Sequence, residues 1–100
     1  MTPDQLRDIV VPALRPYASR IAVFGSWARG EAGAESDVDV LITLRPPDQR
    51  PPIGLRWFEL EQQLGTQLGR PAELVTERAL SPYLRPYVDA DRVVLYEDDG

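Results

Sequence analysis

The chain has 100 residues, of which 43% are apolar, and a net charge of −5 at pH 7. These values predict one folded domain over residues 1–100, exclude an intrinsically disordered chain and argue against direct nucleic-acid binding, which normally uses a basic surface. The sequence contains neither cysteine nor histidine, which excludes disulfides, zinc sites built on these residues and a Ser-His-Asp triad.

The patterns of a membrane or secreted protein are missing from the sequence. No apolar run approaches the roughly 18–20 residues that span a bilayer, and Met1-Thr2-Pro3-Asp4 lacks the basic and apolar regions of a secretory signal. We therefore expect a cytoplasmic protein with no membrane partner. Any chemistry must use carboxylates, hydroxyls, arginines, backbone amides and an oxygen-preferring metal such as magnesium or manganese.

The apolar pattern predicts helices and strands in alternation. Thr2 and Pro3 suit the start of a helix over residues 2–17, and Pro12 is expected to kink it or end its regular part early. Residues 97–100 form an acidic tail that we expect to fray. The order predicts an α/β domain with helices packed against a sheet. The other predicted elements are a strand over 20–24, a short helix over 26–30, a strand over 37–44, a helix over 55–68 followed by Gly69, a strand over 72–76, a helix over 82–90 and a strand over 92–96.

Two aspartates, Asp37 and Asp39, begin the second predicted strand. Residues two apart on a strand point to the same face, with Cα atoms about 6.5–7 Å apart. Asp is disfavoured in strands, and paired carboxylates repel each other unless a cation lies between them. A solvated strand start explains the pair taken alone, whereas a divalent cation that also binds a nucleoside triphosphate explains it functionally.

Gly25-Ser26 favours the functional explanation of the aspartate pair, because it lies eleven residues before Asp37 at the end of another apolar strand. Glycine lets the backbone approach a phosphate closely, the following helix presents free N–H groups, and the Ser26 hydroxyl adds a donor. Arg29 either contacts phosphate or holds the loop before Asp37. Trp27 either stacks on a base or partner, or packs beneath the short helix.

The segments Gly25-Ser26-Trp27-Ala28-Arg29-Gly30 and Ser36-Asp37-Val38-Asp39-Val40-Leu41 together resemble the GSxARG…SDxDxL pattern of minimal nucleotidyltransferases in the polymerase-β-like superfamily. The later helix and strands also fall where that family has them, so the resemblance covers nearly the whole chain. It implies a single nucleotidyltransferase-fold domain: a small mixed sheet of three to four strands flanked by helices. It also implies nucleotide binding by Gly25, Ser26, Arg29, Gly30 and Ser36.

Members of this family use a third carboxylate, usually an Asp on the following strand, and the matching position here is Glu73. The resemblance therefore implies that Asp37, Asp39 and Glu73 bind two metal ions, Mg²⁺ or Mn²⁺, and catalyse nucleotidyl transfer from ATP. The extra methylene of Glu73 leaves three interpretations open. The side chain reaches the metal or acts as a general base, it marks weakened activity, or it simply faces outward from the strand.

The small size of the chain bears on the acceptor, because larger relatives carry extra helical domains that bind it. The resemblance implies AMP transfer onto a hydroxyl of a partner protein, most specifically a HEPN-type toxin in a HEPN/MNT toxin–antitoxin pair, with a homo- or hetero-oligomer possible. An antitoxin that neutralises its toxin by binding alone is the first alternative, and a small-molecule nucleotidyltransferase is the second. The stretch Tyr83-Leu84-Arg85-Pro86-Tyr87 is one candidate contact surface.

Overall fold

Four strands form one sheet in the computed structural model, which describes residues 2–30 and 37–98. The spatial order is β3-β2-β1-β4, so β3 and β4 are the edges. Strand β1 pairs antiparallel with both β2 and β4, whereas β2 and β3 run parallel. The predicted mixed sheet is thereby confirmed. The strand bounds are β1 Ala18–Phe24, β2 Val38–Leu44, β3 Ala72–Thr76 and β4 Val93–Glu97.

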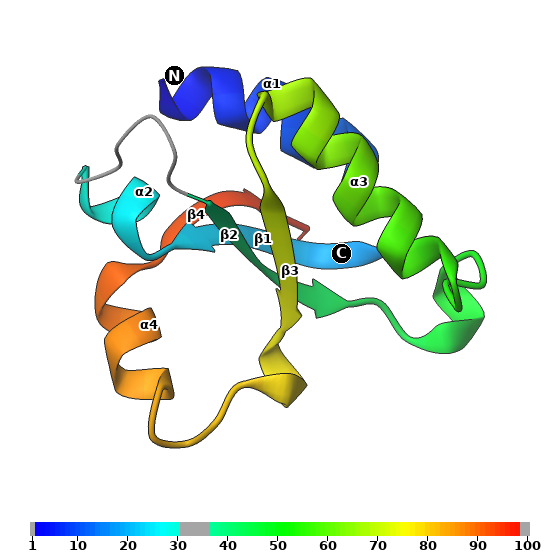
Figure 1. Ribbon diagram of the computed structural model, residues 1–100. Helices are drawn as coiled ribbons and strands as arrows, with labels where there is room; N and C mark the ends of the chain where they lie inside the picture. Colours follow the sequence, from blue (N-terminus) through cyan, green and yellow to red (C-terminus); the bar gives the residue numbers. More distant parts are fainter. Residues whose placement is uncertain (1, 31–36, 99–100) are drawn as a thin grey trace.

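The helices lie on both faces of this sheet. Figure 1 shows α1 and α3 next to each other on one face and α4 on the opposite face, near the end of the sheet where α2 follows β1. In the described part of the chain, no helix has both the length and the apolar character needed to cross a bilayer. The helix bounds are α1 Pro3–Leu14, α2 Ser26–Arg29, α3 Arg56–Leu68 and α4 Arg85–Asp91, with 3₁₀ turns η1 Pro47–Gln49 and η2 Glu77–Ala79.

The core lies between the sheet and the helices α1 and α3. Alternation along β2 sends Val38, Val40 and Ile42 into this core, where Leu64 of α3 is fully buried. The opposite face of the sheet has a much smaller apolar cluster, with Leu41 at its centre. The two faces are therefore unequal: one carries the main core, and the other is free to build a site.

Side chains from the two covering helices also bond the backbone of the edge strands. The Glu61 carboxylate on α3 accepts a hydrogen bond from the Leu74 N–H of β3 at 2.9 Å. Arg7 on α1 donates from Nε to the Leu95 carbonyl of β4 at 3.1 Å. Leu95 lies at a register shift between β4 and β1, so Arg7 satisfies a carbonyl where the regular pairing is interrupted.

The first helix begins as predicted and ends earlier than predicted. Thr2 is its N-cap: its hydroxyl accepts from the Gln5 N–H at 3.2 Å, and the Gln5 side chain accepts from the Thr2 N–H at 2.8 Å. The helix ends at Leu14, two residues after Pro12, which lies inside it. Helical hydrogen bonding continues past Pro12 to Arg15, and the next residue, Pro16, has no N–H to extend it, which explains the end of the helix.

The acidic tail does not fray over the part that the structure describes, so that prediction was wrong. Glu97 belongs to β4 and pairs with Arg20 at 3.0 Å, and Asp98 pairs with Arg45 at 2.7 Å. The last helix also begins at Arg85 rather than at residue 82. The predicted loop over residues 31–36 and the last two residues lie outside the described residues.

Replacing Leu64 by Ala should lower the free energy of unfolding by about 2–5 kcal/mol, because a side chain with 0% exposure leaves a cavity when truncated. Urea denaturation followed by circular dichroism measures this change. Phe58→Ala on the same helix is the matched control, since Phe58 is 64% exposed and its truncation should cost less than about 0.5 kcal/mol. Equal losses in the two variants would contradict the packing of α3 on the sheet.

Candidate active site

A pocket of about 480 Å³ lies on the face of the sheet opposite α1 and α3. The sheet supplies its polar side through Gly25, Asp39 and Glu73. The segment that leaves the sheet after β3 and forms α4 supplies an apolar side, which includes Leu84 and Tyr87. One pocket therefore combines carboxylates with an apolar wall, as a nucleotide with charged phosphates and a planar base would require.

The parallel pairing of β2 with β3 brings Asp39 and Glu73 together. These residues are direct Cα partners in the ladder, and both line the same pocket. Because facing residues of neighbouring strands project to the same side of a sheet, the longer side chain of Glu73 remains beside Asp39. Glu73 is thus exposed and beside Asp39 at the same time.

The pKa of Asp39 is raised above its ordinary value of 3.8. Burial of the carboxyl group is the main cause, followed by the negative charges of Glu73 and Asp37 and by the hydrogen bond to Glu73. Asp37 lies at the exposed start of β2, two residues before Asp39. Both burial and neighbouring negative charges therefore disfavour the charged form of Asp39.

Gly25 makes room for the carboxylate of Asp39. Its backbone has a φ of 74° and a ψ of −151°, a conformation that side-chain-bearing residues rarely adopt. A Cβ at this position would lie 2.6 Å from Oδ2 of Asp39. Ser26 follows as the first residue of α2, and Gly30 ends that helix with a φ of 74°. Glycine at position 25 is thus required by both the turn and the neighbouring carboxylate.

The donor chemistry of the site suits a hard divalent cation. Asp39 and Glu73 offer carboxylate oxygens side by side, and a cation would offset the negative charge of Glu73, which adds to the effect of burial on the Asp39 pKa. Over residues 2–30 and 37–98, however, no three acidic side chains are grouped closely enough to hold a metal ion unaided. A metal would therefore need further ligands, and substrate phosphate oxygens commonly provide them.

Of the remaining predicted site residues, the structure describes some and leaves others outside its described part. Ser36 and the side chain of Arg29 lie outside what the structure describes. Trp27 is half-buried against the main core, and the Arg70 guanidinium lies 4.6 Å from the centroid of its ring. This arrangement favours the structural interpretation of Trp27, because Arg70 already covers one face of the ring.

The apolar wall of the pocket was not predicted from the sequence as part of the site. Leu84 and Tyr87 are 56% and 72% exposed and line the same pocket as Asp39. The available signal was the exposed aromatic stretch ending at Tyr87, which indicated a contact surface but not its position. Only the return of the chain across the sheet places this stretch opposite the carboxylates.

The sequence matches known proteins over most of its length. A family model described as a nucleotidyltransferase domain matches residues 4–95. A "putative protein adenylyltransferase" of Methanocaldococcus jannaschii is 37% identical over 75 residues, which cover 73% of this chain and 71% of that protein. The protein adenylyltransferase MntA of Thermococcus cleftensis is 42% identical over 60 residues, which cover 60% of this chain and 57% of that protein.

Solved structures show the same similarity in three dimensions. A "putative minimal nucleotidyltransferase" matches with a TM-score of 0.72 and 35% identity, over 93% of this chain and 95% of that one. A toxin–antitoxin structure with AMP-PNP matches with a TM-score of 0.76 over 93% of this chain and 74% of that one; at 24% identity, this likeness is one of fold alone. Together, the fold, the carboxylate pocket and the family match over residues 4–95 place this chain in the nucleotidyltransferase domain family.

Proposed function

We propose that this chain transfers AMP from ATP to a hydroxyl group of a partner protein and acts as the antitoxin of a HEPN/MNT toxin–antitoxin pair. The pairing of Asp39 with Glu73 beside Gly25, inside one pocket, is the observation that carries the proposal. The names of the relatives support it, because two of them are called protein adenylyltransferases. The toxin–antitoxin structure with AMP-PNP shares the fold and agrees with both the nucleotide and the kind of partner.

We assign different roles to the residues of the site. Asp37, Asp39 and Glu73 would contribute ligands to Mg²⁺ or Mn²⁺ together with phosphate oxygens of ATP, because the carboxylates, all in the part of the chain that the structure describes, are not grouped closely enough to hold the ion unaided. When bound, the ion would supply positive charge to those phosphate oxygens. Gly25 leaves the space next to Asp39 free of a side chain. The acceptor hydroxyl oxygen attacks the α-phosphorus, pyrophosphate leaves, and a carboxylate of the site takes up the hydroxyl proton.

The acceptor comes from outside the chain in this proposal. The pocket of about 480 Å³ is within the range of small-molecule sites and accommodates one nucleotide. A hydroxyl group on a partner protein must then reach the α-phosphate from the open side. Since both ATP and the proposed toxin are intracellular, we expect the chain to act in the cytoplasm.

Glu73 is the reason to consider a second function, that of an antitoxin that neutralises its toxin by binding alone. The family resemblance places an Asp at this position, and weakened activity would follow if Glu could not replace it. Its position beside Asp39 argues against that outcome, because Glu73 lines the same pocket as Asp39. We therefore rank the enzymatic function first.

Replacing Asp39 by Asn should reduce AMP transfer by about 100- to 1000-fold, because the variant loses charge at the reacting phosphates. The assay incubates the chain with α-labelled ATP, magnesium and a HEPN-type toxin encoded beside it, and measures label on the toxin. Asp48→Asn, in the exposed turn η1, makes the same chemical change away from the pocket and should transfer like the wild type. Neutralisation of the toxin by a wild-type chain that transfers no label would instead support the binding-only antitoxin.

Two changes at Glu73 separate a functional carboxylate from an outward-facing strand residue. Glu73→Asp keeps the charge and should stay within about tenfold of wild-type transfer, whereas Glu73→Gln should lose about 100-fold or more. Initial rates at saturating ATP measure both. Equal, wild-type-like rates in the two variants would show that Glu73 does not act in the reaction.

Replacing Asp39 by Asn should raise the melting temperature at neutral pH in metal-free buffer. Because the fold raises the pKa of Asp39, the folded chain binds this proton more readily than the unfolded chain, and the stability of the wild type falls as pH rises above the ordinary pKa of 3.8. Asn keeps the shape of the carboxyl group without its charge. In acid strong enough to protonate Asp39 in both states, the two chains should melt alike. A destabilised variant at neutral pH would contradict the unfavourable effect of the Asp39 charge; differential scanning calorimetry measures both conditions.

A further inference from the structure

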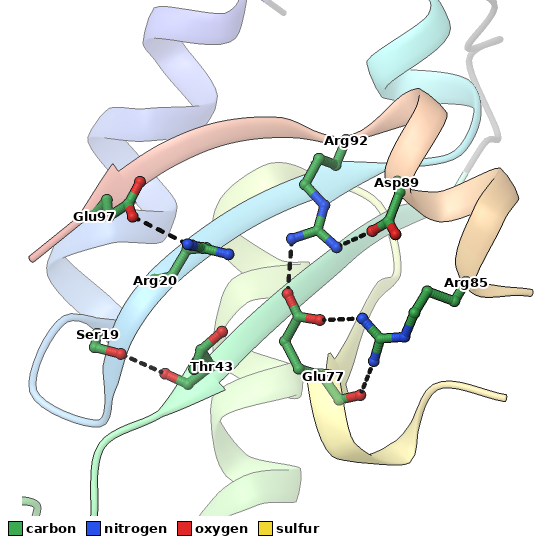
Figure 2. A network of polar contacts seen from close by, with 8 residues as sticks. All are labelled: Ser19, Arg20, Thr43, Glu77, Arg85, Asp89, Arg92 and Glu97. Atoms are coloured by element: carbon green, nitrogen blue, oxygen red, sulfur yellow. Dashed lines mark hydrogen bonds and ion pairs between the residues drawn. The ribbon is translucent and has the colours of Figure 1, made fainter. Parts of the chain in front are cut away.

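The chain leaves the sheet after β3 and returns as β4. Glu77, at the start of this segment, forms hydrogen bonds with two arginines farther along it. Its carboxylate accepts from Arg85 Nη1 at 3.0 Å and from Arg92 Nη1 at 2.8 Å. Its backbone carbonyl accepts a further bond from Arg85 Nη2 at 2.8 Å. Figure 2 shows Glu77 joined to both arginines, and Arg92 joined to Asp89 through its other terminal nitrogen. Residues eight and fifteen positions apart in the sequence are thereby held at one carboxylate.

We define Glu77, Arg85 and Arg92 as the Glu77 cluster, in which the Glu77–Arg92 pair is shielded from solvent. The side chains of Glu77 and Arg92 are 18% and 16% exposed, and that of Arg85 is 42% exposed. The pair Arg20–Glu97, also drawn in Figure 2, has a similar distance of 3.0 Å but 40% and 50% exposure. Screening by water weakens the exposed pair much more, so the Glu77 cluster is the stronger constraint.

The segment enclosed by the Glu77 cluster forms the apolar wall of the pocket. Leu80 and Leu84 line the pocket from within the enclosed segment, and Tyr87 and Val88 line it from α4 immediately after Arg85. Apolar packing behind this wall is limited. Among the described residues, the apolar cluster on this face buries Ala22, Leu41 and Val88, and Phe24, Val75 and Leu80 pack against it while remaining partly exposed. The position of the wall relative to Asp39 therefore depends on Glu77 more than on a core of its own.

We propose that Glu77 is a positioning residue for the nucleotide pocket: by holding Arg85 and Arg92, it fixes the wall of Leu80, Leu84 and Tyr87 against which ATP binds. This role rests on the proposed function, since it assigns the pocket to ATP. Glu77 itself is not among the residues that line this pocket. It acts through the two arginines on the segment between them.

The test compares Glu77→Gln with Glu97→Gln, which makes the same chemical change in the exposed Arg20–Glu97 pair. Isothermal titration calorimetry with a non-hydrolysable ATP analogue and magnesium measures nucleotide affinity. Hydrogen–deuterium exchange measures the backbone protection of residues 78–92 and, as an internal reference, of α3. Arg85→Gln removes one of the two arginines and serves as a milder variant if Glu77→Gln does not fold.

We expect Glu77→Gln to bind the analogue about tenfold more weakly, to exchange faster over residues 78–92 and to leave α3 protected. Glu97→Gln should match the wild type in both measurements. A purely structural role would lower the melting temperature and leave affinity unchanged, which would overturn the inference, as would an equal loss of affinity in Glu97→Gln. No analogue binding by the wild-type chain would instead overturn the proposed function, and the role of Glu77 with it.

Discussion

The parallel register of β2 and β3 is the constraint on which the candidate site depends. It makes Asp39 and Glu73 ladder partners, and the fold must then accommodate two like charges side by side inside a partly buried pocket. Proteins tolerate such an arrangement when function requires it, since the same groups would be more stable apart or neutral. The main core on the opposite face, where α1 and α3 pack against the sheet, offsets the unfavourable free energy of placing these charges together.

The two faces of the sheet therefore have different physical tasks. The face under α1 and α3 is packed with aliphatic side chains and sets the geometry of the strands. The other face has few buried apolar residues, so the wall of the pocket is held mainly by charged contacts from Glu77. Charged contacts fix direction and distance without filling space, which leaves the pocket open between the sheet and α4.

The parts of the fold with a local signal were predictable from the sequence. The apolar runs of β2 and β3 and the glycines at positions 25 and 69 mark element ends through short-range rules, and the structure agrees with them. Asp39 and Gly25 were identified from their spacing and meet as expected. The family resemblance assigned Glu73 to the same site, whereas no local pattern encodes the strand order that makes it the ladder partner of Asp39.

The errors have the same origin. The tail was expected to fray because its own residues are acidic and terminal, yet Glu97 and Asp98 are held by Arg20 and Arg45, far away in the sequence. The wall around Leu84 lies within a segment closed by the pair of Arg92 with Glu77, fifteen residues apart. Long-range ion pairs leave no periodic trace in a sequence, so both features became visible only in three dimensions.

Glu61 has a consequence for how this protein meets other chains. An edge strand normally offers its free N–H groups as a template for another strand, and here the Leu74 N–H of β3 is already bonded to the Glu61 carboxylate. A strand added at this edge would have to displace that carboxylate and would meet its negative charge. Continuous sheets shared between two molecules are thus disfavoured at β3. On the β3 side of the sheet, another protein would instead meet side-chain surfaces, which recognise a partner by shape and chemistry rather than by backbone pairing.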